Sequence, residues 1–255
     1  MSESNDVGRP KRHVDTAGQP TPRGMLLPGD PGRVPLIGKG WDSYREISFE
    51  REFRLAEGRF RDAAIGACST GIGGPSTEIA VLELAETGTR DFIRVGTCAA
   101  LQDNIAPGDI VIQHGAVRLT GTMDAYVGRE YPSVADPAVT AALIAACEEL
   151  GHGYHLGLTA SVDSFYGGQA NPVPGGHGLS GNPDIARELS RRRVATFEME
   201  AATLFTLGSL FGLRTGSICA VGSNRITNRR TANVEPSVRK VCEIASLAIV
   251  RLGQR

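Results

Sequence analysis

The turn from Pro28 to Arg33 has the residue types of an anion-binding loop. It reads Pro-Gly-Asp-Pro-Gly-Arg and follows a short apolar run. Gly29 and Gly32 let backbone N–H groups approach a ligand without a side chain in the way, and the two prolines stiffen the turn by fixing φ. Arg33 adds a planar cation suited to two-point contact with an oxyanion. The turn predicts one wall of a phosphate site, with a tight strand-to-helix turn and a surface arginine as the alternative.

A second glycine-rich stretch, Ser69 to Ser76, leaves an apolar run and enters a helical pattern. Its glycine spacing does not match a dinucleotide fingerprint, and no acidic residue ends the following strand. A Walker lysine and a G-x-S-x-G elbow are also absent from the sequence. The stretch is therefore either a glycine turn for close helix–sheet packing or a backbone-lined wall of a ligand site.

Arg94 stands inside the otherwise apolar run Phe-Ile-Arg-Val-Gly-Thr. Burying an unpaired guanidinium is costly, so Arg94 must meet either an anionic ligand or an acidic partner. Thr97 follows at the end of the run and could donate its hydroxyl to the same anion.

Glu198 and Glu200 lie two residues apart at the end of another predicted strand, where an extended chain places both on one face. Such a pair could ligate a metal, act as acid and base, or accept hydrogen bonds from a polyol. A helix-terminal acid that satisfies backbone amides is the structural alternative. The histidines form no cluster that would support a metal, and we favour the polyol because carboxylates accept strongly from vicinal hydroxyls.

Phe165, Tyr166 and Gln169 combine aromatic rings, a glycine turn and an amide. An aromatic face can stack on a planar base, and a glutamine amide offers one donor and one acceptor to its edge. An ordinary aromatic core pair is the competing interpretation.

Length and composition are those of a globular protein. The 255 residues, 41% hydrophobic and 22% charged, can form one large core. A net charge of −1 provides no overall field for nucleic acid or an anionic membrane. Five scattered cysteines predict reduced, mostly buried thiols and a cytoplasmic protein. We expect residues 1–23 to be a polar N-terminal segment, neither signal peptide nor anchor, before one domain at 24–255.

Short apolar runs alternate with helical patterns, which predicts an α/β fold with a largely parallel sheet covered on both sides. Ligands of such sheets bind beyond the carboxyl ends of the strands, where these motifs fall. Residues 167–183 form the one long irregular loop, a candidate lid or binding loop. Strands are expected at Met25–Leu27, Ala63–Cys68, Phe92–Val95, Ile110–Gln113, His155–Thr159, Thr196–Met199 and Gly216–Val221. Helices are expected at Pro75–Glu86, from Asp136-Pro137 to Gly151, at Ala201–Phe211, and from Glu235 to about Leu252.

Together and in this order, these segments resemble the nucleoside phosphorylase family, which includes uridine phosphorylase and the hexameric bacterial purine nucleoside phosphorylases. The resemblance extends from about His13 to the C-terminus. It is carried by the motifs at Pro28–Arg33, Cys68–Thr77, Arg94–Thr97, Phe165–Gln169 and Glu198–Glu200. It implies a single three-layer α/β/α domain with a twisted mixed sheet, assembled as a dimer-based hexamer with shared active sites.

The resemblance also implies roles for individual residues, with inorganic phosphate as a substrate and no organic cofactor. Phosphate contacts are implied for Gly29, Arg33, Arg94 and Thr97, and for Arg51 reaching in from a neighbouring subunit. Ribose contacts are implied for Met199 and Glu200, and for His13 from across the dimer. Base contacts are implied for Phe165, Gln169, Asn171 and Arg225, and a potassium ion between subunits for Glu52, Ile72 and Ser76. Arg94, Glu200 and Gln169 are the implied catalytic residues.

Within the family the uridine branch fits best, but the base-binding residues depart from its pattern. Asn171 stands where the uridine enzymes have an arginine for the pyrimidine carbonyl, and Gly222 and Ser223 replace bulkier apolar residues. The expected activity is reversible phosphorolysis of a nucleoside, with uridine or a related pyrimidine nucleoside favoured. A purine nucleoside phosphorylase is the first alternative. A nucleosidase and a non-catalytic nucleoside-binding protein are the others.

Overall fold

A computed structural model describes residues 13–176 and 181–253. Residues 1–12 of the predicted N-terminal segment and residues 177–180 of the predicted long loop lie outside this range. The described strands form one 11-stranded mixed sheet. They are β1 Gly24–Leu27, β2 Ser43–Glu50, β3 Phe53–Phe60, β4 Ala63–Cys68, β5 Asp91–Ala100, β6 Ile110–Leu119, β7 Ser133–Val134, β8 His155–Val162, β9 Val194–Glu198, β10 Arg214–Asn224 and β11 Arg229–Arg230.

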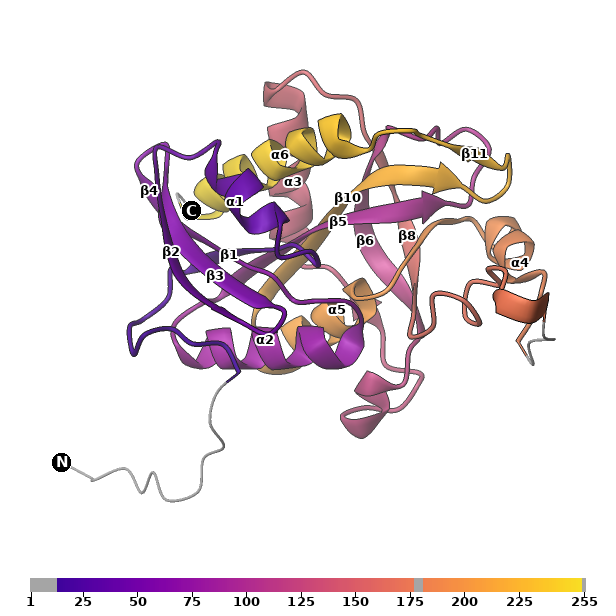
Figure 1. Cartoon of the computed structure of the whole chain (residues 1–255), viewed down its shortest axis with the longest axis horizontal. Coiled ribbons are helices and arrows are strands. Elements are labelled where there is room, and N and C mark those ends of the chain that lie inside the picture. The colour runs from indigo at the N-terminus through magenta and orange to yellow at the C-terminus, as the bar shows by residue number, and fades with distance from the viewer. Residues whose placement is uncertain (1–12, 177–180, 254–255) are drawn as a thin grey trace.

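Helices cover both faces of this sheet (Figure 1). The helices are α1 Arg33–Gly38, α2 Gly74–Glu86, α3 Pro137–Glu149, α4 Ile185–Arg191, α5 Ala201–Phe211 and α6 Glu235–Gly253, with 3₁₀ turns η1 Thr122–Ala125 and η2 Pro174–Gly176. α1, α3 and α6 pack together on one face, and α2 and α5 on the other. Within the described residues, no helix combines the length and apolar character needed to cross a membrane.

The sheet closes partly on itself. β10 pairs with both β5 and β6, and the series β6, β8, β9, β5 completes a ring of five strands. β1, β4, β3 and β2 extend from β5 as an open sheet. This ring brings the carboxyl ends of β5 and β9 to one place, next to that of β1.

The seven strands and four helices expected from the sequence are all present. α3 begins after Asp136, whose carboxylate accepts from the amides of Ala138 and Val139, and α5 ends at Gly212 with φ of +63°. The expectation of a largely parallel sheet was wrong, because β2–β3, β3–β4, β5–β9 and β6–β10 are antiparallel. The mixed sheet implied by the family resemblance is confirmed.

The β2–β3 hairpin is the main element that the apolar pattern missed (indigo to violet in Figure 1). β2 is mostly exposed and carries Glu46, Glu50 and Arg45, so it lacks the apolar run that marked the other strands. Its conformation is stabilised by pairing with β3, which is buried on one face through Phe53 and Leu55. The pairing with β3, and not the apolar pattern of its own residues, therefore makes β2 a strand.

Asp91 joins three strands at the edge of the sheet opposite the carboxyl ends. Its carboxylate, 3% exposed, accepts from Nε and Nη2 of Arg214 at 2.6 Å each and from Nε of Arg23 at 3.1 Å. These two salt bridges link the start of β5 to the start of β10 and to the residue before β1. Removing one partner of such a pair leaves the other charges without compensation.

We therefore expect Asp91→Asn to lower the free energy of unfolding by about 2 kcal/mol, less than for a fully enclosed pair because both arginines reach solvent. Chemical denaturation followed by circular dichroism measures the change. Asp184→Asn, which removes an exposed pair with Arg187 at 3.9 Å, is the control and should shift stability by less than about 0.5 kcal/mol. Equal losses in the two variants would contradict a structural role for Asp91.

Candidate active site

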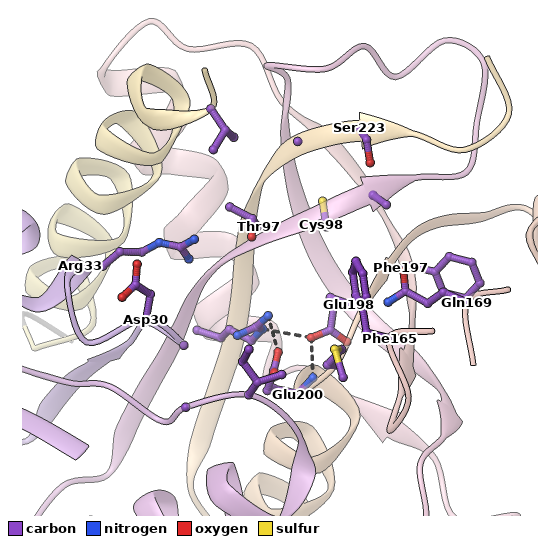
Figure 2. Close-up of a pocket in the computed structure, with 18 of the residues that line it drawn as sticks. Asp30, Arg33, Thr97, Cys98, Phe165, Gln169, Phe197, Glu198, Glu200 and Ser223 are labelled. Atoms are coloured by element: carbon purple, nitrogen blue, oxygen red, sulfur yellow. Dashed lines mark hydrogen bonds and ion pairs between the residues drawn. The ribbon is translucent and has the colours of Figure 1, made fainter. Parts of the chain in front are cut away.

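A cavity of about 680 Å³ opens at the carboxyl ends of β1, β5 and β9 (Figure 2). The expectation that the sequence motifs meet at one edge of the sheet is confirmed. Its walls include these residues singled out from the sequence: Gly29, Arg33, Ile72, Arg94, Thr97, Phe165, Gln169, Met199 and Glu200. Glu198, Gly222 and Ser223, also discussed from the sequence, line it together with Asp30 and Cys98. In Figure 2, Arg33 lies on one side and Phe165 and Gln169 on the other.

Arg94 is the buried cation of this cavity. Its side chain is 7% exposed, its Nε donates to Glu198 Oε2 at 3.0 Å, and its Nη2 lies 2.5 Å from Glu200 Oε2. Burial lowers the pKa of Arg94, but the Glu200 and Glu198 carboxylates outweigh burial and leave the pKa above its usual value. The sequence left two possible partners for Arg94, an anionic ligand or an acidic side chain. The structure provides two acidic side chains.

Gly96 provides the space for this guanidinium. A Cβ at Gly96 would lie 2.9 Å from Arg94 Nη2 and 2.8 Å from Cys219 Sγ, closer than non-bonded carbon atoms pack. The missing side chain therefore lets Arg94 fold back along its own strand toward the acids. Gly96 belongs to the Arg-Val-Gly-Thr motif, but no role followed from the sequence.

The two acids do not share a strand face as predicted, because β9 ends at Glu198 and Glu200 precedes α5 with ψ of −26°, yet both reach Arg94 and their surroundings differ. Glu198 accepts from the amides of Glu200 and Ala201 at 2.8 Å each, and from the Ser161 hydroxyl. It is thus the helix-terminal acid that the sequence left as an alternative, at the start of α5. Glu200 accepts from the amide of Gly73 at 2.6 Å, where φ is +97°.

Burial raises the pKa of Glu200 above the usual carboxyl value. The positive charge of Arg94 opposes this shift and the negative charge of Glu198 adds to it. Glu200 also lines the cavity, so it is an acid whose ionisation affects whatever binds there.

The Pro28–Arg33 turn faces the cavity from the end of β1. Asp30 Oδ1 accepts from Gly32 N at 2.8 Å, which closes the turn, and Thr70 N donates to the Pro28 carbonyl at 2.9 Å. The Arg33 amide donates to the Asp30 carbonyl at 3.0 Å, but its guanidinium forms no hydrogen bond or salt bridge with any residue in 13–176 or 181–253. Burial, and then the neighbouring charge of Arg94, lower the pKa of Arg33.

Phe165 and Gln169 stand on the far side. Phe165 is 52% exposed and packs edge-on against Tyr166 at a centroid distance of 5.4 Å, so this aromatic pair is not a core pair. Gln169 is 4% exposed. The segment thus offers an aromatic face and an amide to the same cavity, as the sequence suggested.

Asn171 and Arg225 bind each other beside Gln169, outside the residues that line the cavity. Nη1 of Arg225 donates to Asn171 Oδ1, and Nη2 donates to the carbonyl of Gln169 at 2.9 Å. Asn171 Nδ2 donates to the Phe165 carbonyl at 2.6 Å. The pair therefore braces the segment that presents Gln169 and Phe165. Base contact by either residue stays a prediction.

His13 and Arg51 do not line the cavity but share a second hollow of about 430 Å³. His13 Nδ1 lies 2.9 Å from Glu83 Oε1, and Arg51 turns the β2–β3 hairpin with φ of +55°. The structure thus brings together the two residues that the family resemblance assigns to a neighbouring subunit's site.

The three residues implied for potassium lie on neighbouring segments. Ser76 Oγ donates to Glu52 Oε1 at 2.8 Å, while the Ile72 side chain is 75% exposed. The described residues contain no group of three or more His, Cys, Asp or Glu that could hold a metal ion.

Ser161 is the residue that the sequence gave no reason to consider. It is the last residue but one of β8, donates to Glu198 and accepts from Ala202 N at 2.9 Å. A serine late in an apolar strand has no distinctive local pattern, so only the pairing of β8 with β9 reveals it.

Comparison with known proteins agrees with this geometry. The profile described as Phosphorylase superfamily matches residues 24–253. A uridine phosphorylase of Thermococcus kodakarensis is 53% identical over 206 residues, 81% of this chain and 74% of that protein. A uridine phosphorylase of Klebsiella aerogenes is 40% identical over 82% of this chain and 83% of its own length. A guanosine phosphorylase of Halorubrum lacusprofundi is 35% identical over 80% of each.

A solved structure supports the same fold. The purine nucleoside phosphorylase of Toxoplasma gondii, in complex with immucillin-H, superposes with a TM-score of 0.84 at 26% identity and covers 92% of both chains. The profile match, the relatives above 30% identity and this structural likeness agree with one another, and this chain is a member of the phosphorylase superfamily.

Proposed function

We propose that this protein catalyses reversible phosphorolysis of a nucleoside, and that uridine or a related pyrimidine nucleoside is the favoured substrate. Nucleoside and phosphate react to give free base and ribose 1-phosphate. The related uridine phosphorylases support this substrate class. The observation that carries the proposal is Arg33, a half-buried guanidinium without a hydrogen bond or salt bridge in the described part of the chain, facing a cavity shared with Arg94.

The arrangement of charge favours a phosphate dianion. Arg33 and Arg94 are close enough for the charge of one to lower the pKa of the other, and an anion between them would relieve this repulsion. Thr97 adds a hydroxyl, and Gly29 adds a backbone without a side chain. We assign all four to phosphate, together with Arg51 from a second copy.

Held in this way, a phosphate oxygen lies where it can attack C1′ of the ribose. The C1′–O bond forms as the C1′–N bond breaks, and the bonding electron pair leaves with the base, which then takes up a proton. The transition state resembles an oxocarbenium ion, which phosphate and the Glu200 carboxylate stabilise. Positioning of phosphate contributes much of the rate enhancement. Glu200 and Met199 also contact the ribose in this proposal, with His13 from a second copy.

Gln169 and Phe165 are assigned to the base. Phe165 offers a face for stacking, and the Gln169 amide can donate to a base oxygen as charge develops on it. Asn171 and Arg225 support this segment from behind, through their mutual hydrogen bond and those to Phe165 and Gln169.

A purine nucleoside is the second candidate. A Cβ at Gly222 would meet nothing nearer than the Cys98 carbonyl at 3.9 Å, so this part of the cavity has spare room. Ser223 is the adjacent polar group on the wall. The related guanosine phosphorylase supports the same alternative.

The assembly and surroundings belong to the same proposal. The hollow that holds His13 and Arg51 supports a dimer in which each copy completes the other's site, and three such dimers would form the hexamer. Potassium between subunits is proposed at Glu52, Ile72 and Ser76, where the Ser76–Glu52 contact supplies oxygen ligands. Five buried free thiols support a cytoplasmic location.

A nucleoside panel tests the activity. Incubation with uridine, thymidine, inosine and adenosine should release free base only when phosphate is present, fastest from uridine, with ribose 1-phosphate as co-product by chromatography. Release without phosphate would indicate a nucleosidase. No release from any of the four would favour a binding protein.

Replacing Arg94 tests the phosphate site. We expect Arg94→Ala to lower kcat/KM for phosphate by roughly 10²–10³-fold, because the anion loses a preorganised charge. Arg94→Lys keeps the charge that neutralises the acids but lacks the planar fork, and should also lose activity. Arg187→Ala, at a 75% exposed side chain, is the control. Near-normal phosphate kinetics in both Arg94 variants would exclude this assignment.

Glu200 should set the acid side of the pH profile. Its pKa is raised above the usual 4.5, and the carboxylate must be ionised to accept from ribose hydroxyls. As pH falls through that raised pKa, kcat/KM for the nucleoside should fall, so the acid limb lies above pH 4.5. Glu200→Gln should be slow and should lack this limb, which separates it from titration of phosphate itself. An unchanged limb in Glu200→Gln would assign the titration to another group.

A further inference from the structure

Glu198 lines the cavity and contacts Arg94, yet no step of the proposed reaction uses it. Its side chain is fully buried, at 0% exposure. Oε2 accepts from Arg94 Nε and from the amides of Glu200 and Ala201, while Oε1 accepts from Ser161. Three donors on Oε2 and one on Oε1, all of them protein groups, engage the whole carboxylate in holding neighbouring residues in place.

The contact to Arg94 is made at the inner nitrogen. Nε is the nitrogen nearest the side-chain stem, so a partner there sets the direction of the guanidinium plane while Nη1 and Nη2 point onward. Nη2 reaches Glu200, the residue proposed for ribose. Gly96 allows the same orientation, since a Cβ there would lie 2.9 Å from Nη2 of this guanidinium.

Glu198 is itself held rigidly. The amides of Glu200 and Ala201 belong to the start of α5, and Ser161 comes from β8. The partial positive charge of a helix N-terminus stabilises a carboxylate placed there. Through Glu198, two elements other than its own strand therefore fix the position of Arg94. These elements are β8 and α5.

We propose that Glu198 is a positioning residue that aims the Arg94 guanidinium at phosphate, so that losing it impairs phosphate use more than nucleoside use. This inference rests on the proposed phosphorolysis. The competing explanation is that Glu198 only caps α5. A buried ion pair adds little stability compared with apolar residues of the same size, which favours the positional role.

The test compares Glu198→Gln with Asp136→Asn. Asp136 is a matched control, because its carboxylate also accepts from two amides at the start of a helix, α3, but contacts no arginine of the cavity. Steady-state kinetics give separate KM values for phosphate and nucleoside, and thermal unfolding with and without inorganic phosphate reports phosphate binding directly.

We expect Glu198→Gln to raise KM for phosphate by about 10-fold or more, and to do so at least about threefold more than KM for the nucleoside. The phosphate-induced rise in unfolding temperature should shrink in parallel. Glu198→Asp, which restores the charge one methylene short, should recover part of the loss and decides the question if the glutamine variant does not fold. Asp136→Asn should keep both KM values within about twofold.

Equal changes in the two KM values, or an undiminished phosphate shift in a folded Glu198→Gln protein, would overturn the positioning role while leaving phosphorolysis intact. A wild-type protein that neither cleaves nucleosides with phosphate nor is stabilised by phosphate would overturn the proposed function, and this inference with it. The two failures are therefore distinguishable.

Discussion

The site depends on one buried charge cluster, Arg94 between Glu198 and Glu200. A guanidinium in the interior of a sheet is tolerable only when acids compensate it, and the acids are tolerable only near the arginine and the amides that start α5. Each member thus requires the others. The glycines nearby follow from the same constraint, since Gly96 leaves space for the guanidinium and the Gly73 amide binds Glu200.

The ring of strands explains how these groups meet. Arg94 and the acids are separated by about a hundred residues in sequence, yet β9 pairs with β5 and β8 pairs with β9. An open parallel sheet would offer ligands a crevice beyond the strand ends. Here the antiparallel β5–β9 pairing places the end of β9 and the start of α5 beside β5. The Arg94 guanidinium and the two carboxylates therefore line the same wall of the cavity.

The two ends of the cavity differ in how firmly their side chains are held. The end proposed for phosphate has Arg33, Arg94 and Thr97 on α1 and β5, which pack against the core. The end proposed for the base is built on the segment around Gln169, braced by Asn171 and Arg225, beside the small residues Gly222 and Ser223. A segment held by a few hydrogen bonds can change its base preference without disturbing the charge cluster, which is consistent with a superfamily that includes uridine, guanosine and purine nucleoside phosphorylases among the relatives of this chain.

The sequence by itself determined the α/β class, the main helices and the motifs that meet at the cavity, because apolar periodicity, caps and glycine turns are local signals. Only the tertiary structure decided the rest. The β2 strand lacks an apolar run and exists through pairing with β3. The choice between an anion and an acid for Arg94 depended on which strand lies next to β5. The contacts of Ser161 and Glu198 also depend on which strands pair. Strand pairing brings together residues that are distant in the sequence, so the spacing of neighbouring residues does not reveal it.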